Sequence, residues 1–324
     1  MLYPFSFKPI LMERVWGGRR LGEMYGKALP PEVPIGEAWE ITDRPEGVSE
    51  ITNGTLAGRN LRWLMENHRD ELLGPGLDYD GRFPLLIKIL DSTQKLSLQV
   101  HPPAHKAAEL NGEPKTEMWY VADATADAEV FVGLKQGVTP EEFQRRIGDG
   151  TVAECFHRIE VARGDVMFIP SGRVHALGAG SVIFEIQQNS NSTYRVFDWN
   201  RVGLDGTPRE LHIDQAMKSI DFTDFEPSLV SDAFSGDDIK RRGLVMEPLF
   251  QVENFQGVAS AVASPPAGKC QVVACLSGEI IAGDGDTSVT LKPGEFCLLP
   301  ACLETRTLTA TQSSEWLMAT PGER

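Results

Sequence analysis

Apolar and polar residues alternate in LSLQVHPP, which runs from position 96 to position 103. Successive side chains of a β-strand point to opposite faces, so the stretch has one apolar and one polar face. The apolar face holds Leu96, Leu98 and Val100, and the polar face holds Ser97, Gln99 and His101. The polar face either meets water or lines a pocket, and if it lines a pocket, the three apolar residues are expected to pack on the outside.

Similar patterns predict the remaining strands. PLLIKIL (84–90) is apolar nearly throughout, which is typical of a strand buried on both faces. Further strands are predicted at 36–42, at 116–124, in several runs from 161 to 201, and from 244 onward. The composition, with 31 glycines and 21 prolines, favours many short strands joined by turns. The fold class predicted is mainly β with a few short helices.

The helices are predicted by apolar spacing and by their end residues. RNLRWLMENHRDELLG has helical spacing through Leu72, with His68 on the core face and Gly74 as the stop. In TPEEFQRRI, Thr139 is expected as the N-cap and Glu142 as the partner in a capping box. Short helices are expected at 104–110 and 214–219.

An internal similarity links two distant segments, as is typical where a β-barrel repeats its hairpins. GDVMFIPSGRVH (164–175) and GEFCLLPACLET (294–305) share a Gly-acid turn, an apolar strand and a proline at a constant offset. His175 of the first copy corresponds to Thr305 of the second, so the second copy lacks that histidine. We expect an N-terminal domain over 1–205, a connector over 206–243, and a second β domain over 244–324.

Charge and cysteine content narrow the function. The net charge of −15 argues against nucleic acid and anionic membranes as partners, because both require a positive face. The five cysteines contain no CxxC pair and are expected to be free structural thiols. The N-terminal MLYPFSFKPI has no basic region followed by a long apolar run, and no segment approaches membrane-spanning length. A cytoplasmic protein is expected.

Four polar residues that fall on predicted strands form a candidate metal site. They are Gln99, His101, Glu117 and His175. Two imidazoles and one carboxylate are a common zinc set, and the amide oxygen would be a weaker fourth ligand that other divalent metals also accept. Each residue alone is more often a hydrogen-bonded or solvated strand residue. His105 is a second choice, because Pro102 and Pro103 disfavour a continuous helix from His101.

The segment EIQQNSNSTYRVFDWNR adds charge to this region. It contains Glu185, Arg195, Asp198 and Arg201. One interpretation is a salt-bridged edge strand. The other is a carboxylate and a guanidinium that face the cavity holding the metal.

Taken together, these segments resemble the type I phosphomannose isomerases in their short bacterial form. The resemblance rests on LSLQVHPP, KTEMWY, IPSGRVHALG and EIQQNSNSTYRVFDWNR, in that order, and on KPILMERVWGGRRL and GEAWEITDRPEGVS nearer the start. It covers most of residues 5–205, and the C-terminal part is similar to the second barrel of the family. The chain lacks the YxDxNHKPE segment and the helical insertion of the long form.

The resemblance implies two cupin (jelly-roll β-barrel) domains, with metal only in the first. It implies zinc, or another divalent metal, held by Gln99, His101, Glu117 and His175. The residues that match pocket-lining positions of the family are Ser97, Lys115, Glu185 and Arg195. It also implies a small sugar phosphate as the partner, in a monomer or homodimer.

The implied reaction interconverts mannose 6-phosphate and fructose 6-phosphate through an enediol. It requires a base, for which Glu185 and Lys115 both remain candidates, and Arg195 fits charge stabilisation or ring opening. Ser97 with Lys95 or Lys115 is expected to hold the phosphate. Two alternatives remain: another metal-dependent cupin enzyme acting on a different sugar phosphate or as an oxygenase, and a non-catalytic sugar-phosphate sensor.

Overall fold

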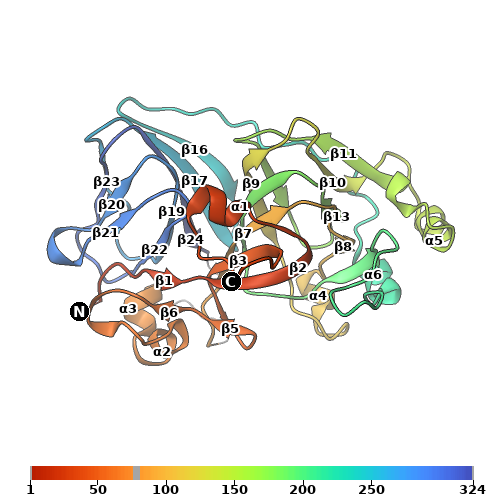
Figure 1. Ribbon diagram of the computed structural model, residues 1–324, viewed down its shortest axis with the longest axis horizontal. Coiled ribbons are helices and arrows are strands. Elements are labelled where there is room, and N and C mark those ends of the chain that lie inside the picture. The colour runs from red at the N-terminus through yellow and green to blue at the C-terminus, as the bar shows by residue number, and fades with distance from the viewer. Residues whose placement is uncertain (1, 76–80, 323–324) are drawn as a thin grey trace.

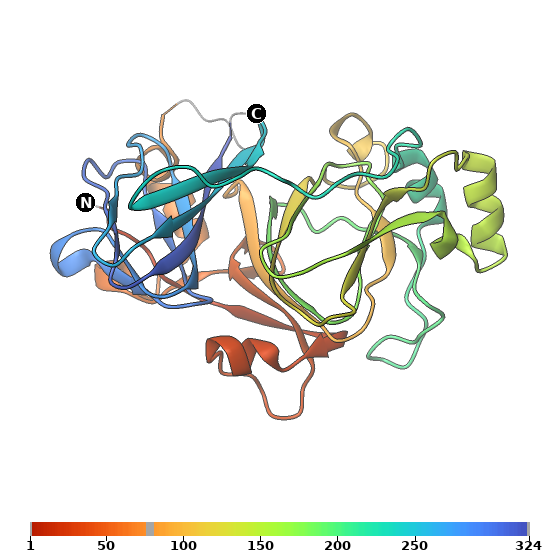
Figure 2. The ribbon, with the colours of Figure 1, turned by 90° about the horizontal axis from the view of Figure 1, so that it is seen from above.

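The protein consists of two β-barrels that lie side by side, as the view from above shows (Figure 2). The structure is a computed structural model and describes residues 2–75 and 81–322. The N-terminal barrel is built mainly from residues 10–197 and the C-terminal barrel from residues 239–321 (Figure 1). The division into domains at 205 and 243 remains a prediction.

The N-terminal barrel is formed by two antiparallel sheets that face each other. Their strands are β2 Ile10–Gly18, β3 Ile35–Ile41, β7 Leu85–Ser92, β8 Leu98–Val100, β9 Glu117–Ala124, β10 Glu129–Leu134, β11 Phe156–Glu160, β12 Val166–Ile169, β13 His175–Leu177, β14 Ser181–Gln188 and β15 Tyr194–Phe197. One sheet has the order β11-β10-β13-β8-β15 and the other β12-β9-β14-β7-β3-β2. Short pairs join β1 (Phe7–Lys8) to β6 (Glu50–Ile51) and β4 (Asp43–Arg44) to β5 (Gly47–Val48).

The central strands of the six-stranded sheet are buried on both faces, as predicted for 84–90. All eight residues of β7 are buried. On β7, Leu90 packs inside the barrel, whereas Ile87 and Ile89 belong to a cluster shared with the C-terminal barrel. The stacked rings of Phe184 and Phe296, 5.5 Å apart, join the two barrels in this cluster. The inward face is therefore free to carry polar groups, because the outward face supplies the hydrophobic contact between the barrels.

The C-terminal barrel also has two antiparallel sheets. Its strands are β16 Ile239–Met246, β17 Phe250–Gly257, β18 Val262–Ala263, β19 Gln271–Ser277, β20 Ile280–Ala282, β21 Val289–Leu291, β22 Phe296–Leu299, β23 Leu308–Ala310 and β24 Ser314–Pro321. Their orders are β16-β17-β24-β19-β22 and β18-β23-β20-β21. The internal similarity is structural: β12 and β22 occupy corresponding positions, and Gly164 and Gly294 before them both have positive φ angles of 93° and 79°.

The helices are short and lie outside the barrels. They are α1 Arg20–Tyr25, α2 Leu61–Asn67, α3 Arg69–Leu73, α4 Ala104–Ala107, α5 Pro140–Gly148 and α6 Ile213–Ser219, with 3₁₀ turns at Gly54–Leu56, Val152–Cys155 and Gly285–Thr287. None of those described is long and apolar enough to cross a membrane. The five cysteines are free thiols, as expected.

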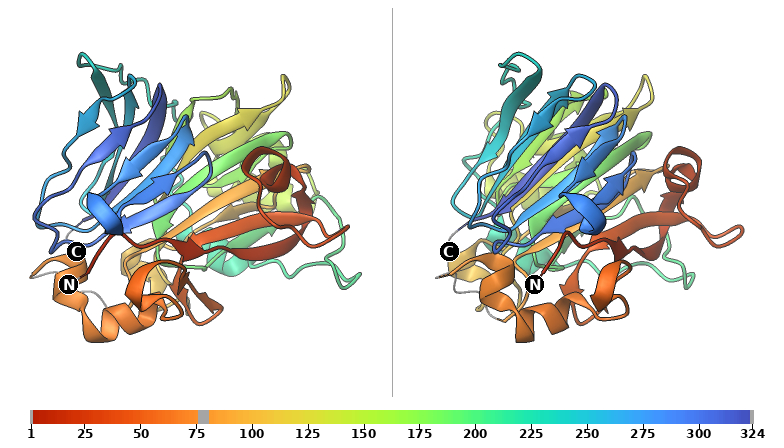
Figure 3. Two further views of the ribbon diagram at one scale, coloured as in Figure 1. Left: turned by 60° about the vertical axis from the view of Figure 1, so that its left-hand side comes forward. Right: turned by 90° about the vertical axis from the view of Figure 1, so that its left-hand side faces the viewer.

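The sequence predicted one continuous helix from residue 61, but the structure has two helices, α2 and α3, that are separated at His68. The backbone there leaves helical geometry, with φ −139° and ψ 29°, and His68 caps α2 and begins α3. Its ring is half-buried and contacts Glu71, so it is not a core residue. Gly74 ends α3 as predicted. Both helices lie beneath the strands of the C-terminal barrel, where the amide of Ala301 donates to the carbonyl of Leu72 (Figure 3).

Helix α5 begins as predicted, but its capping box is incomplete. The Thr139 hydroxyl accepts a hydrogen bond from the amide of Glu142 at 3.2 Å. The Glu142 carboxylate pairs instead with Arg146, one turn along the helix, at 2.9 Å. Helices α5 and α6 cover the outer face of the five-stranded sheet, where Leu98 and Val100 pack with Phe143 and Ala216.

Candidate active site and metal centre

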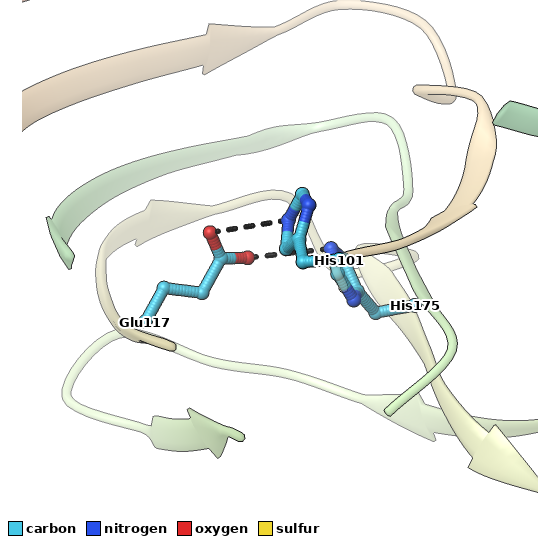
Figure 4. Close-up of side chains that lie close together, drawn as sticks. All are labelled: His101, Glu117 and His175. Carbon is cyan, nitrogen blue, oxygen red and sulfur yellow. Dashed lines mark ion pairs between the residues drawn. The ribbon is translucent and has the colours of Figure 1, made fainter. Parts of the chain in front are cut away.

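Three predicted metal ligands converge inside the N-terminal barrel. His101 follows β8, Glu117 begins β9 and His175 begins β13 (Figure 4). The three side chains are at most 1% exposed. Their ligand atoms all lie within 4.8 Å of one another. The face of LSLQVHPP that carries His101 therefore lines the barrel interior.

The spacing of these atoms fits a bound metal ion. Nε2 of His101 lies 3.5 Å from one oxygen of Glu117, and Nε2 of His175 lies 3.3 Å from the other. Two atoms bound about 2.1 Å from a tetrahedral zinc ion are separated by about 3.4 Å. Nε2 of His101 and Oε1 of Glu117 are buried without a hydrogen-bond partner among the described residues, whereas Oε2 of Glu117 meets the ammonium of Lys115 at 2.6 Å. Buried polar atoms without a partner are costly, and a divalent cation would satisfy both of them.

The backbone orients both imidazole rings for binding through Nε2. Nδ1 of His101 lies 2.7 Å from the carbonyl oxygen of Ser192, and Nδ1 of His175 lies 2.9 Å from that of Arg173. A carbonyl can only accept, so each Nδ1 carries the proton and each Nε2 presents its lone pair to the centre.

The electrostatics of the site favour the protonation states that a metal requires. Burial, together with the charge of Lys115, lowers the pKa of His101 to about 3. Burial also lowers the pKa of His175. For Glu117, burial favours the neutral form, but the charge of Lys115 and the contact with His101 lower the pKa well below its usual value. Two neutral imidazoles and an ionised carboxylate are thus ready to bind a cation.

Gln99 and Ser97 lie beside the metal cluster, because Gln99 is next to His175 and Ser97 is next to Gln99. Gln99 pairs with His175 across the sheet, and its amide nitrogen lies 3.2 Å from Nε2 of His175. Its amide oxygen accepts a hydrogen bond from the Ser97 hydroxyl at 3.3 Å. A half-turn of the amide would direct the oxygen toward the centre and leave Ser97 as the acceptor, since a hydroxyl can play either role.

A pocket of about 560 Å³ opens beside this cluster. Its buried floor includes Lys88, Lys115, Glu185 and Glu37. The other lining residues are Glu13, Arg14, Val15, Trp16, Leu90, Leu96, Ser97, Gln99, Asn191, Thr193, Arg195, Gly203, Leu204, Asp205 and Arg209. Glu185, Lys115 and Arg195, all predicted from the sequence, therefore share one pocket next to the metal cluster.

Side chains from the neighbouring strands β7 and β9 hold Glu185 of β14. Lys88 donates to one carboxylate oxygen at 2.9 Å, and the indole of Trp119 donates to the other at 3.0 Å. Lys115 lies 3.9 Å from Glu185 and 2.6 Å from Glu117. Burial opposes the charge of Lys115, but these two carboxylates outweigh it and raise its pKa. Glu185 is thus fixed in place beside the cluster.

Sequence reasoning missed Lys88 and Glu37. Nζ of Lys88 also lies 3.8 Å from Glu37, which accepts hydrogen bonds from Arg14 and Trp39. Burial favours neutral Glu37, but Lys88, Arg14 and the indole of Trp39 lower its pKa to about 2. The sequence did contain one indication of this pair. Lys88 lies within a strand predicted to be buried on both faces, and a buried charge requires a buried partner.

The predicted placements of Lys95 and Leu96 are not met, whereas His105, the second choice as a ligand, stays out of the metal cluster as expected. Lys95 lies outside the pocket, where its ammonium pairs with Glu129 at 3.3 Å and packs over the rings of Phe131 and Trp199. His105 is exposed on α4 and does not join the metal cluster. Leu96 packs inside the barrel, because the regular strand begins only at residue 98 and the alternation does not extend before it.

Comparison with known proteins gives a consistent result. Residues 5–135 match the family model for the catalytic domain of type I phosphomannose isomerase. The chain is 34% identical over 315 residues to the putative mannose-6-phosphate isomerase YvyI of Bacillus subtilis, covering 95% of this chain and 96% of that protein. It is 36% identical over 301 residues to mannose-6-phosphate isomerase ManA of the same organism, covering 92% and 93%.

The fold agrees with these relatives. The crystal structure of the mannose 6-phosphate isomerase from Bacillus subtilis superimposes with a TM-score of 0.90 at 30% identity, covering 98% of this chain and 99% of that chain. A putative mannosephosphate isomerase from Archaeoglobus fulgidus shares the fold with a TM-score of 0.76 at 21% identity. The predicted mainly β, cupin-type fold is confirmed.

Proposed function

This chain belongs to the type I phosphomannose isomerase family, and from that membership we propose that it interconverts mannose 6-phosphate and fructose 6-phosphate. The observation that carries the proposal is the pocket in which Glu185, Lys115 and Arg195 lie next to the His101–Glu117–His175 cluster. An aldose–ketose isomerase requires these parts in one cavity: a base, a stabiliser of negative charge and room for a sugar.

The metal is proposed to be zinc, held by His101, Glu117 and His175 with the amide oxygen of Gln99 as a fourth ligand. The spacing of the first three and their unpartnered atoms support this assignment. A bound divalent cation supplies an electrophile for the two oxygen atoms at C1 and C2 of the sugar. Chelation is therefore expected to abolish turnover.

Glu185 is proposed as the base that moves the proton between C1 and C2. Each of its oxygens accepts one hydrogen bond, from Lys88 and from Trp119, so lone pairs remain for a substrate proton. Lys115 is the weaker candidate, because its ammonium is in contact with two carboxylates that favour the protonated form. Lys115 is instead proposed to stabilise negative charge on the substrate, as is Arg195, and both line the pocket.

Exchange of the proton at C2 separates the two candidates for the base. Glu185→Gln and Lys115→Met would each be incubated with mannose 6-phosphate deuterated at C2, and loss of deuterium would be followed by NMR. Glu185→Gln is expected to stop the loss of deuterium, and Lys115→Met to slow it. Full exchange in Glu185→Gln would remove Glu185 from this role.

The substrate is proposed to contact Ser97, which lines the same pocket and is 3% exposed. Lys95 is not part of this proposal, because its ammonium lies away from the pocket. A cytoplasmic location is also proposed, since the substrate and product are metabolites of sugar phosphate metabolism.

The first experiment is an assay of purified protein on mannose 6-phosphate, with the fructose 6-phosphate formed measured by a coupled reaction. The assay would be repeated after chelation and again with zinc restored. Activity that disappears with chelator and returns with zinc supports the proposal. Protein that binds zinc but forms no product would refute the isomerase assignment, and activity that survives complete metal removal would refute the metal ligands.

A further inference from the structure

Another cavity lies where the two barrels meet, and it has a volume of about 290 Å³. It shares no described lining residue with the catalytic pocket. Its walls include the segment around β1, the end of helix α1, strand β3, and the segment 290–296 that links β21 to β22 (Figure 1). Pockets that hold small molecules begin at about 300 Å³, so the cavity has room for one molecule of monosaccharide size.

The end of helix α1 is inserted between the barrels at this point. The ring of Tyr25 meets the ring of Phe184 edge-on at 5.8 Å, and Nζ of Lys27 donates to the carbonyl of Gly294 at 3.1 Å. Gly294 has a positive φ of 79°, and a Cβ atom there would lie 2.4 Å from Cγ of Tyr25. Residues of both barrels therefore hold this segment beside the cavity.

A buried ion pair forms part of the cavity wall. Nζ of Lys27 lies 2.7 Å from Oε1 of Glu40, and the two side chains are 8% and 5% exposed. Lys27 is the one partner of the Glu40 carboxylate among the described residues. A carboxylate can accept several hydrogen bonds, so Glu40 keeps free lone pairs. The ammonium of Lys27 has three protons and uses two, on Glu40 and on Gly294, so one is left for a ligand.

The cavity lining carries more negative than positive charge. Its charged residues in the described chain are Glu40, Glu295 and Lys27. Oε2 of Glu295 accepts a hydrogen bond from the backbone amide of Lys292 at 2.8 Å, which adds no positive charge. Burial raises the pKa of Glu40, and the charge of Glu295 adds to this effect, whereas Lys27 opposes it. The lining thus holds one ammonium for two carboxylates, and a bound monocation would balance the charge.

The remaining wall is partly apolar and partly hydroxylated. Phe7, Leu291 and Phe296 supply apolar surface. The hydroxyls of Ser6 and Thr290 also line the cavity and make no hydrogen bond within the described chain. A hydroxyl either donates or accepts, so these groups suit a ligand that has hydroxyls of its own. A compact molecule that carries several hydroxyls and one positive charge matches the whole lining.

We propose that this cavity binds a small hydroxylated amine of the amino-sugar class. Its ammonium group is held by the carboxylates of Glu40 and Glu295, and the remaining proton of Lys27 is donated to one of its hydroxyls. A sugar phosphate is disfavoured, because its charge has the same sign as the excess charge of the lining. The site goes beyond the isomerase function, since its lining is separate from that of the catalytic pocket.

Glucosamine and glucose form a matched pair of probes, because glucosamine has an ammonium where glucose has a hydroxyl. Binding of each to the purified protein would be measured by saturation-transfer NMR and calorimetry. Glucosamine is expected to bind with a dissociation constant of about 1 mM or lower, and glucose at least about tenfold more weakly. Glu40→Gln removes the buried negative charge and is expected to weaken glucosamine binding by about 10- to 100-fold.

Two further variants locate the bound probe. Glu185→Gln neutralises a buried carboxylate in the catalytic pocket, and this matched control is expected to change glucosamine binding by less than about threefold. Thr290→Trp places a large ring on the cavity wall and is expected to abolish binding. Thr290 is exposed on β21, so this variant decides the question if Glu40→Gln does not fold.

Each outcome has a definite meaning. Loss of glucosamine binding in Glu40→Gln and Thr290→Trp, with binding kept in Glu185→Gln, supports the site. Equal binding of glucosamine and glucose would overturn it, as would unchanged binding in Thr290→Trp or in a folded Glu40→Gln. Loss confined to Glu185→Gln would place the probe in the catalytic pocket, and wild-type protein that binds no glucosamine at about 10 mM would also overturn the site. Turnover of mannose 6-phosphate plays no part in this test, so the isomerase assignment is judged separately.

Discussion

The clearest energetic prediction concerns Lys88→Met. Lys88 is 5% exposed, and its ammonium lies 2.9 Å from Glu185 and 3.8 Å from Glu37. Methionine has a similar length and no charge, so the substitution leaves the two buried carboxylates without their shared cation. Removing one partner of a buried ion pair is strongly destabilising because the remaining charge is uncompensated.

The magnitude follows from the contacts. At 2.9 Å and an effective dielectric constant of about 20, the attraction between unit charges is about 6 kcal/mol, before the cost of desolvation is subtracted. Glu185 keeps the Trp119 indole, and Glu37 keeps Arg14 and Trp39. We therefore expect the lower end of the usual range for a broken buried pair, about 3 kcal/mol in the free energy of unfolding.

The assay is urea denaturation of the metal-free protein, followed by tryptophan fluorescence. A double-mutant cycle with Glu185→Gln is expected to give a coupling energy of about 2 kcal/mol, because neither charge is then left alone. Lys240→Met, on an exposed position of β16, is the control and is expected to change stability by less than about 0.5 kcal/mol. A coupling energy below about 0.5 kcal/mol would refute the arrangement around Glu185.

Three further predictions concern the metal, pH and a helix end. His175→Asn is expected to weaken zinc binding by at least about 100-fold, measured by competition with a chromogenic chelator, and undiminished affinity would exclude His175 as a ligand. The folded-state pKa of His101 is about 3, below its unfolded value, so the unfolded protein binds more protons as the pH falls. The metal-free protein should therefore lose stability between about pH 6.5 and pH 3, by up to about 1.4 kcal/mol per unit of pKa shift, and His101→Asn should flatten this slope in denaturation curves. Asn60→Ala removes the side-chain cap of α2 on the amide of Trp63 and should cost about 1 kcal/mol by thermal denaturation, whereas Asn60→Asp should cost little.

Local patterns were sufficient where the relevant partner lies close in the sequence. The period of two in LSLQVHPP placed Gln99 and His101 on one face, and the structure confirms that this face meets the site. Thr139 was identified as a helix cap because its partner is the amide three residues on. The repeated Gly-acid turn predicted β12 and β22 because a turn, an apolar strand and a proline are features of a single short segment.

Local patterns were insufficient where a distant contact competes with a near one. The spacing from residue 61 to 73 suits one helix, yet the chain turns at His68 so that α3 can pack beneath the C-terminal barrel. The alternation at Leu96 suggested the outer face, but regular pairing begins later and the side chain enters the barrel. Lys95 was assigned to the pocket, but contacts with Glu129 and Phe131 of β10 hold it elsewhere.

The sequence by itself determined which residue types this protein has for binding a cation and moving a proton, and it placed each on a strand. Only the tertiary structure decided how they are paired. Lys88 donates a hydrogen bond to Glu185, which lies 97 positions later in the sequence, and Asp198 accepts one from Arg209. The reason is physical. Side-chain direction follows from the local backbone. The pairing of buried charges depends on which strands lie side by side, because a charge that is removed from water needs a partner of opposite sign.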